Sequence, residues 1–186
     1  MNPYPILFLN GTSSAGKTST CRALQREWRE PLVYVSCDAF IYMFSEAVLK
    51  ERSNLPRILP PILSAFHRSL PLIAGCGFPM VVDAVIEDAA WLQECVTALA
   101  DYNVIFVGVH CPVEELERRE LARGDRHVGI ARWQFDHVHR FSAYDFELHT
   151  DRLTPEQCGH SLAALLRSNR PGTAFPRLRA HYAAIT

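Results

Sequence analysis

The stretch that decides the fold is ILFLNGTSSAGKTS, residues 6–19. Its first four residues are all apolar, which is typical of a buried parallel strand. Residues 11–18, GTSSAGKT, fit the pattern G-x-x-x-x-G-K-[ST] at all four fixed positions. A helical pattern follows over residues 18–28. A strand, a glycine-rich loop and a helix in this order predict a phosphate-binding P-loop.

The residue types of this loop suit a nucleoside triphosphate. Glycines let backbone N–H groups turn inward without a clash from Cβ, and together with the N-terminus of the following helix they form an anion cradle. Lys17 adds a positive charge at the β- and γ-phosphates, and the Thr18 hydroxyl can ligate Mg²⁺. We therefore expect ATP and Mg²⁺ as cofactors, held by Gly11, Thr12, Ser13, Ser14, Ala15, Gly16, Lys17, Thr18 and Ser19.

Short apolar runs alternate with helical patterns along the rest of the chain. We expect strands at residues 32–35, 80–82, 104–109 and 146–148, and helices at 87–99, 113–123, 130–139 and 155–166. This alternation predicts an α/β fold, with a mainly parallel sheet covered by helices on both faces. Residues 1–186 are expected to form a single P-loop domain.

Two segments are harder to assign. Residues 39–75 have a helical pattern interrupted by four prolines, which predicts two or three short helices rather than one. The tail at about 168–186 contains Pro, Gly and Arg, and we expect it to be irregular. It can still pack on the body through Phe175, Leu178 and Tyr182.

Composition narrows the classes of partner and location. The formal net charge is −1, so nucleic acid is not an expected partner. The six cysteines form no C-x-x-C pair, which favours reduced core thiols in a cytosolic protein. The first residues lack the basic segment of a signal peptide, and no run of about 18 apolar residues predicts a membrane span. We expect a cytoplasmic protein; the oligomeric state stays open.

Two aspartates follow expected strands at the edge of the sheet where ligands gather. Asp38 comes shortly after residues 32–35 and could accept a proton from an attacking hydroxyl; the alternative is an N-cap for the next helix. Asp83 ends the strand at 80–82 and could hold Mg²⁺; the alternative is a solvated carboxylate. For Asp38 we favour the catalytic base.

The segment ERRELARGDR, residues 117–126, is rich in arginine. One interpretation is a solvated helix with Glu–Arg pairs. The other is a lid at about 113–130 whose arginines neutralise charge during phosphate transfer. Arg123 and Arg126 flank Gly124-Asp125, where helix gives way to loop, so we expect these two, and then Arg119, to act in catalysis, with Arg123 also binding the nucleotide. Arg118 is expected at the surface.

These features together resemble the chloramphenicol phosphotransferase family, over roughly residues 5–165. The resemblance rests on the P-loop stretch, on Asp38, and on the segments VVDAV, VIFVGVHCPVEELERRELARGDR, VH (138–139) and YDFELHT. It implies a P-loop NTPase with a five-stranded parallel sheet of the nucleotide-kinase or shikimate-kinase type, and ATP-dependent phosphorylation of an antibiotic hydroxyl. Asp38 would match the family's catalytic base, and Lys17 and Thr18 its phosphate and Mg²⁺ ligands. Its lid arginines would correspond to Arg119, Arg123 and Arg126.

The acceptor is less well defined than the chemistry. Residues 39–75, the expected acceptor region, resemble the family weakly, and Asp83-Ala84 stands where a family member carries two aspartates. A chloramphenicol-like antibiotic is the leading acceptor. An aminoglycoside is an alternative, because Asp38, Glu46, Asp83, Glu87 and Asp88 could form an acidic mouth. A third hypothesis is a nucleotide-binding regulatory module that has no acceptor.

Overall fold

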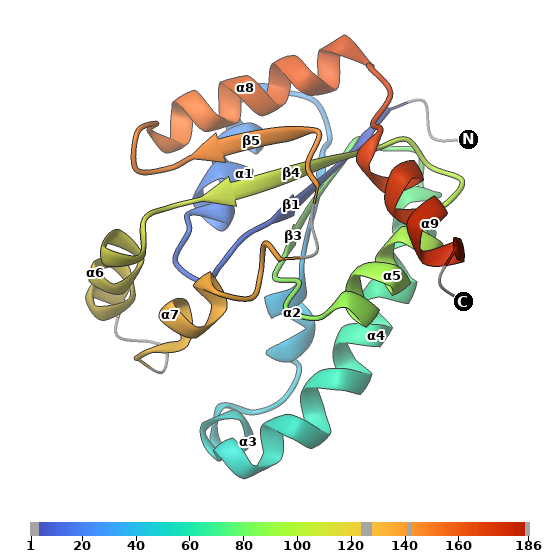
Figure 1. Ribbon diagram of the computed structural model, residues 1–186. Coiled ribbons are helices and arrows are strands. Elements are labelled where there is room, and N and C mark those ends of the chain that lie inside the picture. The colour runs from blue at the N-terminus through green and yellow to red at the C-terminus, as the bar shows by residue number, and fades with distance from the viewer. Residues whose placement is uncertain (1–3, 124–127, 141–142, 185–186) are drawn as a thin grey trace.

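The computed structural model describes residues 4–123, 128–140 and 143–184, and a parallel five-stranded sheet lies at the centre of that part of the chain (Figure 1). The strand order β2-β3-β1-β4-β5 is formed by β1 (Ile6–Asn10), β2 (Val33–Ser36), β3 (Met80–Ala84), β4 (Val104–His110) and β5 (Phe146–His149). All pairs in this sheet are parallel, which confirms the expected α/β P-loop fold. The P-loop strand β1 is therefore central.

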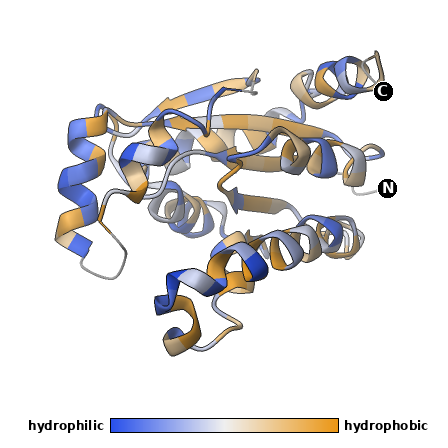
Figure 2. Cartoon of the chain, turned by 60° about the horizontal axis from the view of Figure 1, so that its bottom comes forward, coloured by the Kyte–Doolittle hydropathy of each residue, from blue (hydrophilic) through white to orange (hydrophobic). Residues whose placement is uncertain are grey.

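Helices cover both faces of the sheet. One face carries α1 (Lys17–Trp28) and α8 (Pro155–Ser168), and the other carries α4 (Leu55–Ala74), α5 (Ala89–Ala98) and α9 (Ala174–Ala184) (Figure 1). Successive β1 side chains enter opposite layers, so Ile6 and Phe8 belong to the α4–α5–α9 core and Leu7 and Leu9 to the α1–α8 core. Burial on both sides explains why β1, β3 and β4 are mostly apolar, and the strands at the centre of the sheet are mainly orange in Figure 2.

Shorter elements lie at the carboxyl ends of the strands. After β2 come α2 (Cys37–Ile41), α3 (Glu46–Lys50) and the 3₁₀ turn η1 (Arg52–Asn54); after β4 come α6 (Val113–Arg123) and α7 (Ile130–Phe135). The helix expected to reach residue 139 ends at Phe135, and the turn that follows buries Val138. Among the helices of the described ranges, none is long and apolar enough to cross a bilayer.

Residues 39–75 form several helices, as expected, because α2, α3 and α4 share this segment, but the breaks do not fall at Pro60, Pro61 or Pro71. Helix α4 runs unbroken through Pro60, Pro61 and Pro71. Pro60 and Pro61 are exposed, and the carbonyls four residues before them, which lose an N–H donor, lie in the first turn of the helix. Pro71 removes the donor for the carbonyl of His67 farther along the helix. The opposite face of α4 stabilises the helix by burying Ile58, Leu63, Phe66, Leu70 and Ala74.

The expectation of an irregular tail is also wrong, because α9 occupies Ala174–Ala184. Asp145 Oδ1 accepts hydrogen bonds from the backbone N–H groups of Thr173 and Ala174, at 2.7 and 3.0 Å, and so satisfies donors at the start of this helix. The expected anchors are confirmed: Phe175, Leu178 and Tyr182 are buried. Helical spacing of these apolar residues was the signal in the sequence.

We predict that Phe175→Ala lowers the free energy of unfolding by about 3–5 kcal/mol, because it leaves a cavity in the core. The Phe175 ring lies 5.5 Å from that of Phe8 and 5.1 Å from that of Phe106, centroid to centroid. Urea denaturation measures the change. Arg177→Ala, at an exposed position of the same helix, should change the stability little. Equal stability of the two variants would show that α9 contributes nothing to the core.

Candidate functional site

The turn between β1 and α1 has the backbone of an anion cradle. Gly16 has φ +89° and occupies the N-cap of α1, and no acidic residue lies in the first turn of that helix. Its amides and dipole therefore favour a negatively charged group. A Cβ at Gly11 would lie 2.5 Å from the carbonyl oxygen of Val109, so only glycine fits there. The residues present suit a bound polyphosphate.

Lys17 is buried at the base of this cradle. Its Nζ donates hydrogen bonds to the carbonyl oxygens of Gly11 and Thr12, each at 2.9 Å, and lies 3.8 Å from Asp83 Oδ1. The ammonium is thus held inside the loop, where it can contact phosphate oxygens.

Asp83 is not a solvated carboxylate, since only 4% of it is exposed. Its Oδ2 accepts hydrogen bonds from Thr18 Oγ1 at 2.8 Å and from the Tyr34 hydroxyl at 3.0 Å. Burial, with a further contribution from Asp83, raises the pKa of Tyr34 to about 12, so this phenol stays a donor. The pairing of Thr18 with an acidic oxygen is the donor set that Mg²⁺ prefers in nucleotide sites.

Arg119 joins α6 to the end of β5. Its guanidinium donates to Glu115 Oε1 at 2.7 Å, to Thr150 Oγ1 at 3.1 Å and to the Thr150 carbonyl at 2.8 Å. Hydrogen bonds from Arg118 and Arg119 lower the pKa of Glu115 to about 2. Thr150 Oγ1 also donates to the Ala15 carbonyl of the P-loop at 2.7 Å. Arg119 is therefore fixed beside the cradle, whereas Arg118 is exposed, as expected.

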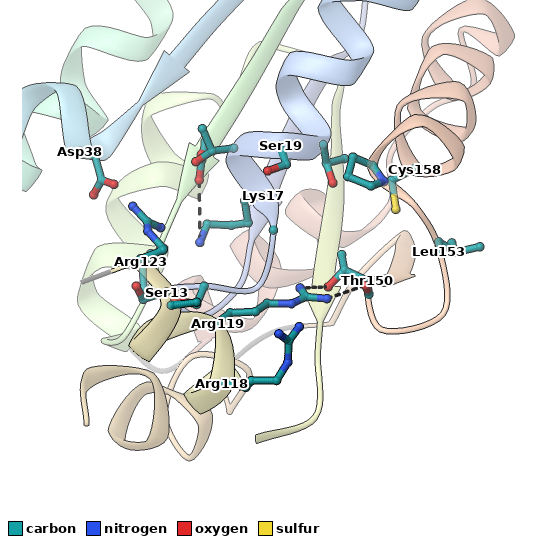
Figure 3. A pocket seen from close by; sticks show the side chains of 18 of the residues that line it. Ser13, Lys17, Ser19, Asp38, Arg118, Arg119, Arg123, Thr150, Leu153 and Cys158 are labelled. Atoms are coloured by element: carbon teal, nitrogen blue, oxygen red, sulfur yellow. Dashed lines mark hydrogen bonds and ion pairs between the residues drawn. The ribbon is translucent and has the colours of Figure 1, made fainter. Parts of the chain in front are cut away.

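A cavity of about 440 Å³ brings most of the predicted residues together (Figure 3). Asp38 lies on one side of it, in the first turn of α2, and Ser36 rather than Asp38 is the N-cap of that helix. The Arg123 side chain reaches from α6 toward the side where Asp38 lies (Figure 3). The lining includes Ser13, Ser14, Gly16, Lys17, Thr18, Ser19, Asp83 and Arg119. Arg126 lies outside the described residues.

Sequence reasoning missed the wall opposite Asp38. Thr150, Leu153, Pro155 and Cys158 line this part of the cavity and come from the end of β5, the following turn and the start of α8. Thr150 could have been found, because it follows a strand at the same edge of the sheet that pointed to Asp38 and Asp83. Leu153 and Cys158 carry no signal of their own, since apolar residues are ordinary in a core.

The VH and YD segments have a structural role. Asn10 Nδ2 donates to the Val138 carbonyl at 3.0 Å and to the Tyr144 hydroxyl at 2.9 Å, and its Oδ1 accepts from Ile86 N at 2.9 Å. The Tyr144 hydroxyl oxygen lies 2.6 Å from His139 Nδ1. Because the Tyr144 oxygen accepts from Asn10, its hydrogen can be donated to an unprotonated His139. These bonds attach Val138 and Tyr144, and through Tyr144 also His139, to the strand that leads into the P-loop.

Comparisons with known proteins define the family. A model of the chloramphenicol phosphotransferase-like proteins matches residues 5–167. The chain belongs to this family. The Mycobacterium tuberculosis protein named "Putative O-phosphotransferase Rv2636" is 31% identical over 203 residues, covering 95% of this chain and 88% of that protein.

Solved structures support the fold of this family member. The Mycobacterium tuberculosis APS kinase CysC, solved with AMPPNP and APS, gives a TM-score of 0.65 at 20% identity, over 88% of this chain and 97% of that one. The Deinococcus radiodurans tunicamycin resistance protein gives 0.66 at 18% identity, over 91% and 98%. Together with the family match, these results identify a P-loop kinase that acts on a small molecule.

We predict that stability falls in acid partly because of His139. Burial, with contributions from His110 and Lys17, lowers its pKa to about 4, and burial also lowers the pKa of His110. The native state thus binds these protons less readily than the unfolded chain, whose histidines titrate near 6.5. Their contribution to the free energy of unfolding is full above about pH 6.5 and is lost as the pH falls toward 4.

The measurement is urea denaturation between pH 4 and 8, compared with that of His139→Gln. The free energy of unfolding of this variant should decline less steeply below pH 6.5, because the variant lacks one histidine whose pKa the folded state lowers. Equal slopes for the variant and the natural chain would contradict the assignment.

Proposed function

We propose that this kinase transfers the γ-phosphate of ATP to a hydroxyl group of an antibiotic, with a neutral, chloramphenicol-like molecule as the first candidate. The observation that carries the proposal is the meeting of Lys17 and Asp38 in one cavity. A phosphate cradle and a carboxylate suited to act as a base face the same space, which is what in-line transfer to a hydroxyl requires.

The cavity offers separate places for the triphosphate and for the nucleoside of ATP. The P-loop amides and Lys17 would hold the triphosphate. Thr150, Leu153, Pro155 and Cys158 offer a mainly apolar wall beyond Gly16, which suits the nucleoside. The Arg119 guanidinium, fixed between Glu115 and Thr150, is placed to contact the phosphates or the nucleoside.

Asp38 would take the proton of the acceptor hydroxyl as the oxygen attacks the γ-phosphorus. The bond from the γ-phosphorus to the bridging oxygen then breaks, and that oxygen leaves with ADP. Lys17, Arg123 and Arg119 would stabilise the charge on the transferred group. Mg²⁺, with Thr18 and Asp83 as its protein contacts, would neutralise phosphate charge.

The acceptor side favours a neutral, partly apolar molecule over a polycation. Two carboxylates of the expected acidic mouth are occupied, because Glu46 pairs with Lys50 at 2.6 Å and Asp88 caps α5 by accepting from Ala90 N. The segment between α2 and α3 instead exposes apolar side chains, with Tyr42 57%, Met43 69% and Phe44 38% exposed. Such a surface suits an aromatic acceptor. A chloramphenicol-like molecule fits it better than an aminoglycoside.

Incubation of the protein with Mg·ATP and a panel of antibiotics tests the proposal. Mass spectrometry should show a phosphate adduct, a mass increase of about 80 Da, on a neutral hydroxylated member of the panel. Lys17→Ala should lower transfer at least ~10²-fold and weaken nucleotide binding, because it removes the charge in the cradle. Asp38→Ala should lower transfer ~10²–10⁴-fold with nucleotide affinity nearly unchanged.

Arg177→Ala and Asp101→Asn, both at exposed positions outside the cavity, are the controls and should behave like the natural chain. Adducts found only on aminoglycosides would show that the acceptor is an aminoglycoside rather than a neutral molecule. Hydrolysis of ATP without any adduct, unaffected by Asp38→Ala, would establish the regulatory module instead.

We also predict that phosphate transfer requires Mg²⁺ and that the Thr18 hydroxyl helps to bind it. Chelation of Mg²⁺ should abolish transfer. Thr18→Val keeps the shape of the side chain but removes the hydroxyl that contacts Asp83, so it should raise the Mg²⁺ concentration needed for half-maximal rate ~10-fold or more. Rate measurements over a Mg²⁺ titration test this, with Thr173→Val on the far side of the molecule as control. An unchanged Mg²⁺ requirement in Thr18→Val would remove Thr18 from the metal site.

A further inference from the structure

Gln134 is a buried amide that connects the P-loop to the segment after β3. Only 7% of Gln134 is exposed. Its Oε1 accepts a hydrogen bond from the backbone N–H of Ser13 at 2.6 Å, and its Nε2 donates to Glu87 Oε1 at 2.5 Å. An apolar side chain of similar size would fill the space, so these two bonds, rather than packing alone, account for an amide here.

The helix that carries Gln134 is fixed to the arginine helix. Glu120 of α6 is 1% exposed, and its two carboxylate oxygens accept from Gly129 N at 2.7 Å and from Ala131 N at 2.9 Å, at the start of α7. On the same helix, Glu120 lies between Arg119 and Arg123. A continuous set of contacts therefore runs from the arginines through Glu120 and α7 to a P-loop amide.

Glu87 is the other end of this connection. It lies three residues beyond β3, is half-buried, and its pKa is raised by burial. The hydrogen bond from Gln134, with further contributions from His137 and Lys17, opposes this rise. Through Gln134 the Glu87 carboxylate is connected to the Ser13 amide of the phosphate cradle, although it does not line the cavity.

We propose that Gln134 is a positioning residue, which aligns the arginine helix with the phosphate cradle by holding the Ser13 amide and the Glu87 carboxylate together. This inference rests on the proposed phosphotransfer. Small misplacements of catalytic groups lower rates strongly, so loss of the bridge should lower turnover more than nucleotide affinity. Gln134→Leu should reduce kcat ~10-fold or more and change the Kd for Mg·ATP less than ~3-fold.

An exchange of the two side chains separates positioning from packing. Gln134→Glu alone places two carboxylates in contact, so turnover should fall at pH 8 and recover partly toward pH 6, where the pair shares a proton. The double variant Gln134→Glu with Glu87→Gln restores a donor facing an acceptor. The new amide at position 87 can donate to the new carboxylate at position 134, which still accepts from the Ser13 N–H. The kcat of the double variant should return to within ~3-fold of the natural value.

The assay measures Mg·ATP turnover with the acceptor found in the panel, Mg·ATP binding by calorimetry, and folding by circular dichroism. Gln93→Leu, the same substitution at an exposed position of α5, is the control and should keep natural turnover. Natural turnover in Gln134→Leu, or an exchanged pair no better than Gln134→Glu, would overturn the inference alone. A natural chain without any Mg·ATP turnover would overturn the proposed function, and the inference with it.

Discussion

The phosphate end of this molecule depends on how closely the turn after β1 approaches β4. Only a hydrogen atom fits between Gly11 and the Val109 carbonyl, and the positive φ of Gly16 then directs the chain into α1. This approach places Lys17 and the N-terminus of α1 at the carboxyl edge of the sheet, beside Asp83 on the adjacent strand. A larger residue at position 11 would displace the entire cradle.

Two buried amides fix the surroundings of this turn. Asn10, immediately before the loop, bonds to Ile86 after β3 and to Val138 and Tyr144. Gln134 bonds to Ser13 within the loop and to Glu87, again after β3. Both side chains satisfy donors and acceptors that would otherwise be buried without partners, which would be costly. The P-loop is thus held from two sides, and Val138 and Tyr144 of the VH and YD segments take part in this support.

The sequence predicted the sheet and the P-loop because their signals are local. An apolar run, a glycine pattern and a lysine-threonine pair lie within residues 6–18. The helix boundaries that failed depend on distant contacts. Helix α4 tolerates its prolines because its other face is buried against the sheet, and α9 begins where Asp145, about 30 residues earlier, accepts its first N–H groups. Propensity within a window does not include such partners.

The residues of the candidate site also fall into two groups, those that the sequence could reveal and those that it could not. Asp38 and Asp83 could be found because they follow strands at one edge, a consequence of parallel topology. Gln134, Glu87 and Leu153 could not, because a buried amide, a loop carboxylate and a leucine have many ordinary roles. Their place becomes clear only when α6, α7 and the end of β5 are brought against the loop.

The segment from α2 to α4 contributes few residues to the cavity. Among the described residues, the cavity takes only Cys37 and Asp38 from residues 37–75, while α4 is held by apolar packing on the sheet and α5. Side chains at the tip of this arm, such as Tyr42 and Met43, can change without disturbing a phosphate contact. If this arm contacts the acceptor, as proposed, a few surface replacements would alter the choice of small molecule and leave the phosphate-binding residues intact.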